Sequence, residues 1–179
     1  MKRFIGWLVL AAAVIGLDQW SKLAVLARFA EYESLPVTDF FNLVLVYNPG
    51  AAFSFLADHA GWQRWFFVIL AIVICIWLLR LIWQHRAEAL QPAAFSLVVG
   101  GAIGNVIDRL VHERVVDFLD SHLAGSHWPA FNLADIFVVG GTALLVLAGV
   151  LERAKQRPIQ LVEIKRRQNI EEKNKGEKS

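Results

Sequence analysis

Long apolar stretches recur along this chain, separated by shorter segments rich in polar and turn-forming residues. A helix that crosses the hydrocarbon core of a bilayer needs about 20 predominantly apolar residues. Stretches that approach or exceed this length lie at about residues 4–30, 65–83, 93–110 and 133–151. The pattern therefore predicts an all-α membrane protein with four transmembrane helices.

A two-residue alternation follows the first apolar stretch, and it is typical of a half-buried strand. The alternating apolar residues are Phe41, Leu43, Leu45 and Tyr47. The turn sequence Asn-Pro-Gly at residues 48–50 comes next, and a weaker strand signal lies at residues 115–119. We expect a small β-sheet on the outer surface of the membrane.

Composition strengthens the membrane assignment. Apolar residues make up 56% of the 179 residues, and the mean hydropathy is +0.47. A small single domain leaves much of its surface exposed, so it could not bury this many apolar side chains internally. The single cysteine, Cys75, excludes an intramolecular disulfide and disfavours a cysteine-based metal site, which leaves inert packing as its expected role.

The first apolar stretch also has features of a secretory signal peptide, because Met1-Lys2-Arg3 precedes it. No small-residue cleavage site follows its core. The alanines at residues 11–13 lie inside the stretch, which continues apolar on both sides of Asp18. An uncleaved first helix is therefore favoured.

Basic residues predict the orientation of the helices, because cytoplasmic loops carry an excess of Lys and Arg. One side of a four-pass topology receives Lys2, Arg3, Arg80, Arg86, Arg153, Lys155 and Arg157. The outer loops, at about residues 31–64 and 111–132, are poorer in basic residues although they contain Arg64 and Arg114. We expect one domain of residues 1–152 with both termini cytoplasmic, followed by a charged cytoplasmic tail at residues 153–179.

Ionisable residues converge at the outer ends of three apolar stretches. Asp18 lies about 14 residues into the first helix, roughly 20 Å across a core about 30 Å thick. Asp108 and Arg109 end the third helix, and Asp135 begins the fourth at the same level. Charged groups at membrane depth are costly and generally mark a functional site.

Each of these groups also has a purely structural interpretation. Asp18 and Lys22 have the i, i+4 spacing of an intrahelical ion pair. Asn105, Asp108 and Arg109 share one helix face, where a buried Asp–Arg pair with an amide partner would fasten the helices together. The small-xxx-small pattern at residues 100–104 favours close helix contact rather than ligand binding.

Two aspartates have surroundings that push their proton affinities apart. Asp135 follows Asn132 with the spacing of a capping box, and the helix dipole there favours an ionised carboxylate. Asp117 lies in the apolar run Val-Val-Asp-Phe-Leu, which raises a carboxyl pKa. Such a pair suits acid/base chemistry, but the sequence does not give the distance between the two carboxyls. Catalytic and structural roles both remain open on these features.

Other catalytic motifs do not assemble from the sequence. His112, His122 and His127 lie in an outer loop without zinc-type spacing on one helix, so solvated or interfacial histidines are expected. The chain contains no Gly-x-Ser-x-Gly elbow and no phosphate-binding loop. We therefore expect no metal site and no nucleic-acid partner.

Five ordered blocks of sequence together carry a family resemblance. They are Asp-Gln-Trp-Ser-Lys at residues 18–22, Asn-Pro-Gly-Ala-Ala-Phe at 48–53, Gly-Gly-Ala-Ile-Gly-Asn-Val-Ile-Asp-Arg at 100–109, Val-Val-Asp-Phe at 115–118 and Phe-Asn-Leu-Ala-Asp at 131–135. The set resembles the lipoprotein signal peptidase family, also called signal peptidase II. The match extends to about Leu151, and the blocks are highly specific when taken jointly.

The resemblance implies a bacterial inner-membrane aspartic endopeptidase. Such an enzyme removes the signal peptide from diacylglyceryl-modified prolipoproteins, just before the lipidated cysteine, in the outer leaflet. By motif, Asp117 and Asp135 correspond to the catalytic dyad. The positions that match the family's substrate-binding or dyad-supporting residues are Asp18, Lys22, Asn48, Gly50, Asn105, Asp108, Arg109 and Asn132.

The family resemblance has further implications. An extracytoplasmic sheet cradles the substrate, no metal or organic cofactor is needed, and the cyclic peptide globomycin inhibits the enzyme.

Two alternatives come from other classes of protein. A small proton-coupled transporter would use the intramembrane Asp, Lys and Arg as a relay, although the chain shows no inverted repeats or broken helices. A non-catalytic membrane scaffold would use the same residues only to hold its helices together.

Overall fold

The computed structural model describes residues 1–50 and 61–152, and within them lie the predicted helices. They are α1 (Lys2–Leu26), α2 (Trp62–Gln84), α3 (Leu90–Val111) and a fourth helix, Leu133–Glu152. All four of these helices are long and apolar enough to cross a membrane, which confirms the prediction. Residues 51–60 of the first outer loop and the predicted tail, residues 153–179, lie outside the described residues.

The helix ends differ from the expected ends by a few residues. The first helix was expected to reach residue 30 but ends at Leu26, where the Ala27 N–H bonds the Leu23 carbonyl and the chain turns toward Tyr32 at a positive φ of 66°. The second helix begins earlier than residue 65, at Trp62, directly after Gly61 with a φ of 86°. Apolar length therefore located the helices, and local backbone geometry set their ends.

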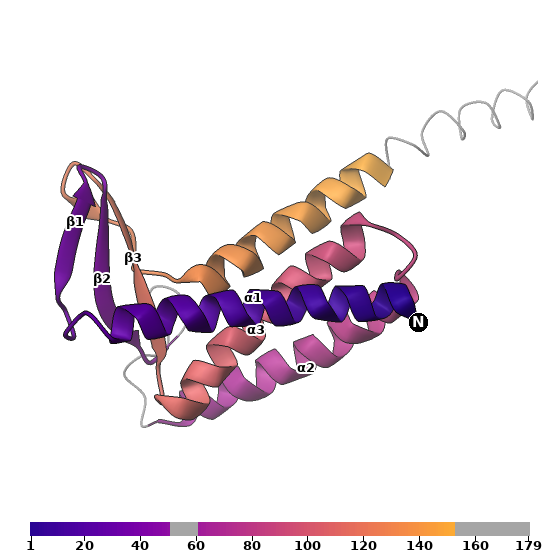
Figure 1. Ribbon diagram of the computed structural model, residues 1–179, viewed down its shortest axis with the longest axis horizontal. Helices are drawn as coiled ribbons and strands as arrows, with labels where there is room; N and C mark the ends of the chain where they lie inside the picture. The colour runs from indigo at the N-terminus through magenta and orange to yellow at the C-terminus, as the bar shows by residue number, and fades with distance from the viewer. Residues whose placement is uncertain (51–60, 153–179) are drawn as a thin grey trace, which may run out of the picture.

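A four-stranded antiparallel sheet stands at one end of the helices, opposite the N-terminus (Figure 1). Its strands, in the order in which they pair, are β1 (Ser34–Thr38), β2 (Phe41–Asn48), β3 (Val115–Leu123) and β4 (Ser126–His127). The strands expected near residues 41–47 and 115–119 are confirmed as β2 and β3. Sequence reasoning missed β1 and β4. The first is exposed along its whole length and contains Pro36, and the second spans two residues.

The register between β2 and β3 brings the first outer loop to the end of the bundle. Val46 lies opposite Asp117, and Asn48 lies opposite Val115. The register shifts between Leu43 and Val46, as at a β-bulge. Asn48 and the following Gly50 therefore lie beside the start of β3.

The central helix of the bundle is α3, which packs against α1, α2 and the fourth helix. Its glycines allow this close approach. A Cβ atom at Gly100 would lie 2.6 Å from Val14 Cβ on α1, and one at Gly101 would meet the Ala134 carbonyl oxygen of the fourth helix. The predicted role of the small-xxx-small pattern in close helix contact is confirmed.

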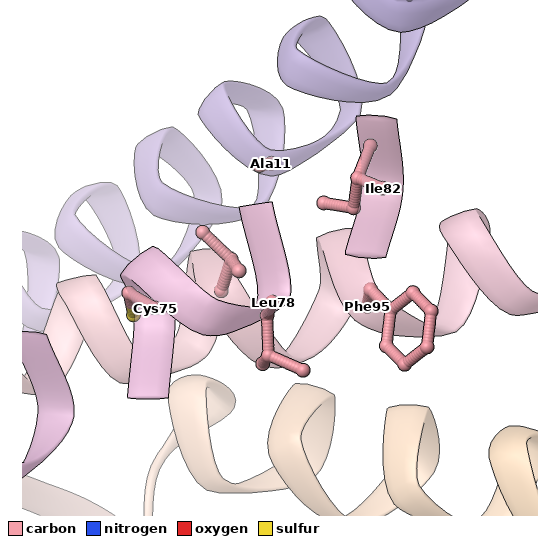
Figure 2. Packing of buried hydrophobic residues seen from close by; sticks show 6 residues of the cluster. Ala11, Cys75, Leu78, Ile82 and Phe95 are labelled. Carbon is pink, nitrogen blue, oxygen red and sulfur yellow. The ribbon is translucent and has the colours of Figure 1, made fainter. Parts of the chain in front are cut away.

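Two apolar clusters hold these elements together. The first joins α1, α2 and α3 and includes Ala11, Leu78, Ile82 and Phe95 (Figure 2). Cys75 is 3% exposed within this cluster, in agreement with a packing role. The second cluster, which includes Val25, Leu45, Val116 and Phe118, fixes the sheet to the end of α1.

Candidate active site

A buried ion cluster lies where α1, α3 and the fourth helix meet. Lys22 Nζ is 2.8 Å from Asp18 Oδ2 and 2.8 Å from Asp108 Oδ2, and these three side chains are at most 2% exposed. Lys22 also donates a hydrogen bond to Asn105 Oδ1 at 3.0 Å. The predicted Asp18–Lys22 pair is confirmed.

The partner of Asp108 differs from the expected one. We expected an Asp108–Arg109 pair on one helix face, but Asp108 turns toward Lys22 on α1 instead. Its carboxylate also accepts hydrogen bonds from Val116 N–H at 3.0 Å and Gln19 Nε2 at 2.9 Å. A side chain's direction depends on which helices are neighbours, and the sequence alone did not give that information.

The ion cluster links four elements of the fold. Asp18 Oδ1 accepts a hydrogen bond from the backbone N–H of Ala134 at 2.9 Å, which ties α1 to the first turn of the fourth helix. Asp108 ties α3 to β3 through Val116. Gln19, which sequence reasoning did not single out, also bonds the Gly104 carbonyl at 3.2 Å. A buried cation with two anionic partners therefore fixes the elements that carry Asp117 and Asp135.

Asn132 connects those two aspartates. Its Oδ1 accepts the Asp135 N–H at 3.0 Å, and Asp135 Oδ2 accepts the Asn132 N–H at 3.2 Å, which confirms the capping box. Asn132 Nδ2 donates to Asp117 Oδ1 at 2.7 Å. The side chain of Asn132 is completely buried. One amide therefore positions the two carboxyl groups relative to each other.

Asp117 is held in surroundings that favour its protonated form. It is 3% exposed on β3. Burial is the largest cause of a rise in the pKa of Asp117 to about 7, and the negative charge of Asp135 adds to it. Hydrogen bonds from Asn48 Nδ2, at 3.1 Å, and from Asn132 oppose this rise in pKa. The predicted direction of the Asp117 pKa shift is confirmed.

Asp117 and Asp135 line one cavity of about 710 Å³ at the sheet end of the helices. Four of the predicted supporting residues line it too, namely Asn48, Gly50, Asn105 and Arg109. Asn105 Nδ2 donates to Asp135 Oδ1 at 2.9 Å. The other predicted supporting residues, Asp18, Lys22, Asp108 and Asn132, do not line this cavity but are buried in the contacts described above.

Arg109 braces the turn after β2. Its Nη2 donates to the Gly50 carbonyl at 2.8 Å, and its guanidinium carbon lies 5.0 Å from the centre of the Phe67 ring. Gly50 N–H donates in turn to Asn48 Oδ1 at 3.0 Å. Arg109 thus holds the turn whose Asn48 contacts Asp117.

The remaining walls of the cavity are apolar, and sequence reasoning missed them. They come from the segment 128–131 and from one face of the fourth helix that includes Ile136, Val139 and Gly140. Val139 is 68% exposed although it lines the cavity, so the cavity extends to the lipid-facing side of the bundle. The only sequence signal that could have identified these three residues is their i, i+3, i+4 spacing, which puts them on one helix face just after Asp135.

Of the predicted outer-loop histidines, His122 and His127 lie on the sheet, whereas His112 is the C-cap of α3. His122 and His127 stack with ring centres 4.8 Å apart, and His127 Nδ1 is 2.9 Å from Asp120 Oδ1. His127 is 54% exposed, as expected for a solvated histidine. Among the described residues, no group of three or more His, Cys, Asp or Glu side chains could hold a metal ion.

An aspartic peptidase needs two carboxyls with different proton affinities, one to carry a proton and the other to activate water. This four-helix membrane fold places two carboxyls, those of Asp117 and Asp135, in one cavity beside the exposed side of the fourth helix. The fold and this pair of carboxyls are those that a membrane aspartic peptidase would need.

The family follows from comparison with known proteins. Residues 10–151 match the family model described as signal peptidase (SPase) II. A lipoprotein signal peptidase of Azoarcus sp. (strain BH72) is 61% identical over 152 residues, which cover 85% of this chain and 86% of that protein. One from Aeromonas hydrophila subsp. hydrophila is 52% identical, over 87% of this chain and 94% of that protein.

A solved structure supports the same assignment. It is a bacterial membrane enzyme determined by the in meso method at 2.3 Å resolution, 31% identical, with a TM-score of 0.74 over 83% of this chain and 89% of that chain. The chain belongs to the lipoprotein signal peptidase (signal peptidase II) family of aspartic peptidases, which cleave signal peptides from prolipoproteins. Membership of this family decides against the transporter and scaffold alternatives.

Proposed function

We propose that this peptidase cleaves the bond just before the diacylglyceryl-modified cysteine of prolipoproteins, with Asp117 and Asp135 as its catalytic pair. The observation that carries the proposal is that both carboxyls line one cavity and are joined through Asn132. The raised pKa of Asp117, about 7, supports different protonation states for the two groups near neutral pH.

In the proposed mechanism, Asp117 starts protonated and Asp135 starts ionised. Asp135 removes a proton from a water molecule, and the oxygen of that water forms a bond to the scissile carbonyl carbon. Asp117 gives its proton to the carbonyl oxygen, and a tetrahedral diol results. The carbon–nitrogen bond then breaks as Asp135 protonates the leaving amine and Asp117 recovers a proton from one hydroxyl. The pair thereby returns to its starting state.

The neighbouring amides position this pair in the proposal. Asn48 and Asn132 donate to Asp117, and Asn105 donates to Asp135. Donors to a carboxylate stabilise its ionised form, so Asn48 and Asn132 limit the pKa of Asp117, and Asn105 holds the Asp135 carboxyl in position. Arg109 acts through Gly50 and Asn48 rather than through a direct bond to either carboxyl.

The apolar walls of the cavity support a lipid-modified substrate. A signal peptide reaches the site as a membrane helix, so it needs a lateral opening to the bilayer. The exposed side of Val139 and the neighbouring Gly140 provide that opening on the fourth helix. The same cavity, of about 710 Å³, would bind membrane lipid and the cyclic peptide inhibitor globomycin.

We also propose that the protein lies in the bacterial inner membrane with its cavity toward the outer leaflet and both termini in the cytoplasm. The end of the bundle away from the sheet carries basic residues of α1, of the end of α2 and of the α2–α3 connection, namely Lys2, Arg3, Arg80 and Arg86. The positive-inside rule supports a cytoplasmic position for that end.

The test is cleavage of a diacylglyceryl-modified prolipoprotein by the purified protein in lipid. We expect Asp117→Asn and Asp135→Asn each to reduce kcat by about 10³-fold or more, because the proton cannot be transferred. Asp39→Asn is the matched control, since Asp39 is an exposed aspartate on the same outer sheet region. Undiminished cleavage by either folded cavity variant would refute the assignment of the pair.

A further inference from the structure

A second cavity lies at the opposite end of the bundle from the proposed catalytic pair. It measures about 510 Å³ and lies between the start of α1 and the connection from α2 to α3. Arg3, Trp7 and Leu10 of α1 line one side, and Glu88 and Ala89 line the other. This cavity takes no part in the proposed peptide cleavage, so it requires a separate explanation.

The polar residues of this cavity are fixed in place. Arg3 Nη1 donates to the Ala87 carbonyl at 2.7 Å, and Trp7 Nε1 donates to the Arg86 carbonyl at 3.3 Å. A guanidinium has five N–H donors, so Arg3 keeps donors for another acceptor. These bonds hold α1 against the α2–α3 connection and set the cavity's shape.

The electrostatics of this end favour an anion. The described residues there carry Lys2, Arg3, Arg80 and Arg86 against two acidic residues. These two carboxylates bond other partners than Arg3, because Glu88 Oε1 lies 2.9 Å from His85 Nδ1 and Glu152 accepts a hydrogen bond from Gln91 at 2.6 Å, and the four basic residues outnumber them. A phosphate beside Arg3 would therefore meet a net positive surface.

The remaining lining indicates that the ligand also has an apolar part. From Arg3 to Leu10, the α1 wall extends about 10 Å along the helix axis. It is formed by Gly6, Trp7 and Leu10, and a Cβ atom at Gly6 would meet no atom within 4 Å. Tryptophan is enriched at membrane interfaces. Trp83 lies at this end of the bundle, where it packs edge-on against Phe4 with ring centres 5.1 Å apart. Inorganic phosphate would leave this apolar groove unused.

We propose that this second cavity binds an anionic phospholipid, with its phosphate at Arg3 and the upper part of an acyl chain along Gly6 and Leu10. Arg86, whose guanidinium carbon lies 4.5 Å from the centre of the Trp83 ring, adds a further positive charge to this end of the bundle. The lipid would join α1 to the α2–α3 connection. Basic pockets between transmembrane helices commonly recognise such headgroups.

The experiment is native mass spectrometry of the full-length protein in detergent, titrated with dioleoylphosphatidylglycerol. Dioleoylphosphatidylcholine, with the same chains and no net charge, and inorganic phosphate are the comparison probes. We expect tight binding of phosphatidylglycerol, weaker binding of phosphatidylcholine and no displacement by millimolar phosphate. Equal binding of the two lipids, or displacement by phosphate, would overturn the proposal.

Two pairs of variants separate a built site from general surface charge. Arg3→Gln should raise the apparent Kd for phosphatidylglycerol about fivefold, whereas Lys2→Gln, which removes the same charge outside the cavity lining, should change it less than about twofold. Gly6→Leu should fill the groove and weaken binding by a similar factor. Gly16→Leu is its control, because Gly16 also lies on α1 with open space around it.

The outcomes of the variant titration are distinct. Equal losses in Arg3→Gln and Lys2→Gln would show only general electrostatic attraction and refute a defined site. Unchanged affinity in Gly6→Leu would refute the acyl-chain position. Prolipoprotein cleavage should persist in all four variants, which checks that each is folded and keeps this result separate from the test of the catalytic pair.

Discussion

The chemistry of the site at the scale of single residues depends on the environment of one carboxyl. Asp117 is buried beside Asp135, and these two causes raise its pKa to about 7. In the proposed mechanism the active form has a protonated Asp117. As long as Asp135 is ionised, cleavage activity should therefore be highest below that pKa and decline as the pH rises through about 7.

Removing the hydrogen bond from Asn48 should move this decline in activity. The Asn48 amide stabilises the ionised form of Asp117, so Asn48→Ala should raise the Asp117 pKa and shift the decline to higher pH. The measurement is the pH profile of kcat for prolipoprotein cleavage. Asn42→Ala is the matched control, because Asn42 donates to Asp120 on the same strand, outside the cavity, at 2.8 Å. A shift to lower pH in Asn48→Ala, or an equal shift in both variants, would contradict the assignment of this pKa to Asp117.

Between elements, the buried ion cluster is the main polar connection. Lys22 on α1 balances Asp18 and Asp108, and these carboxylates bind the fourth helix and β3. Lys22→Met would leave two buried carboxylates without their cation, which should lower the free energy of unfolding by about 3–5 kcal/mol. Reversible unfolding in mixed detergent micelles measures this change.

Neutralising the whole cluster provides the control for charge. The triple variant Asp18→Asn, Lys22→Met, Asp108→Asn leaves no unpaired charge, so it should lose less stability than Lys22→Met alone. Lys2→Met removes an exposed lysine of the same helix and should change stability by less than about 0.5 kcal/mol. If Lys22→Met were as stable as the wild type, the cluster would have no role in holding the elements together.

Close packing of α3 against the fourth helix should also contribute to stability. A Cβ atom at Gly101 would meet the Ala134 carbonyl and lie 2.9 Å from Val138 Cγ2. Because a backbone atom cannot move aside cheaply, Gly101→Ala should lower the free energy of unfolding by about 1–3 kcal/mol. Gly149→Ala lies on the fourth helix with open space around it and should be neutral or stabilising by about 0.5–1 kcal/mol. Equal stability of the two variants would show that this contact is not tight.

At the scale of the whole molecule, apolar length predicted most of the fold. A segment of about 20 apolar residues has few stable alternatives to a membrane helix, because lipid leaves no partner for unpaired backbone groups. Strand β2 was also predictable, since its apolar residues alternate and contact the end of α1. Strand β1 was not, because it is only five residues long, is exposed throughout and is interrupted by Pro36.

The candidate site was predictable only in part, for a physical reason. Motif residues such as Asp117, Asp135 and Asn132 lie together, and the capping pattern at Asn132 is visible in the sequence. The partner of Asp108 depends on which helix lies opposite, so the expected pairing with Arg109 was wrong. The apolar walls at Trp128 and on the fourth helix depend on how the sheet meets the bundle. Both features depend on contacts between residues far apart in the sequence, and these contacts were not visible in the sequence pattern.

The cavity opens to the outside of the bundle beside the fourth helix. Substrate has to enter beside the fourth helix, where Gly140 lines the cavity and a Cβ atom would meet no atom within 4 Å. Gly140→Leu should leave the fold intact but project a side chain into the path of the substrate helix. A steric cost of about 1–3 kcal/mol lowers kcat/KM for prolipoprotein about tenfold or more.

The same substitution at Gly149 tests whether the effect is local. Gly149 lies on the same helix with open space around it but does not line the cavity, so Gly149→Leu should cleave prolipoprotein at the wild-type rate. The pKa of Asp117 should stay near 7 in both variants, because neither glycine contacts Asn48, Asn132 or Asp135, which set it together with burial. A loss of kcat/KM in Gly140→Leu with an unchanged pH profile therefore identifies a block to entry. Full activity in Gly140→Leu would instead place the route of the substrate on another side of the bundle.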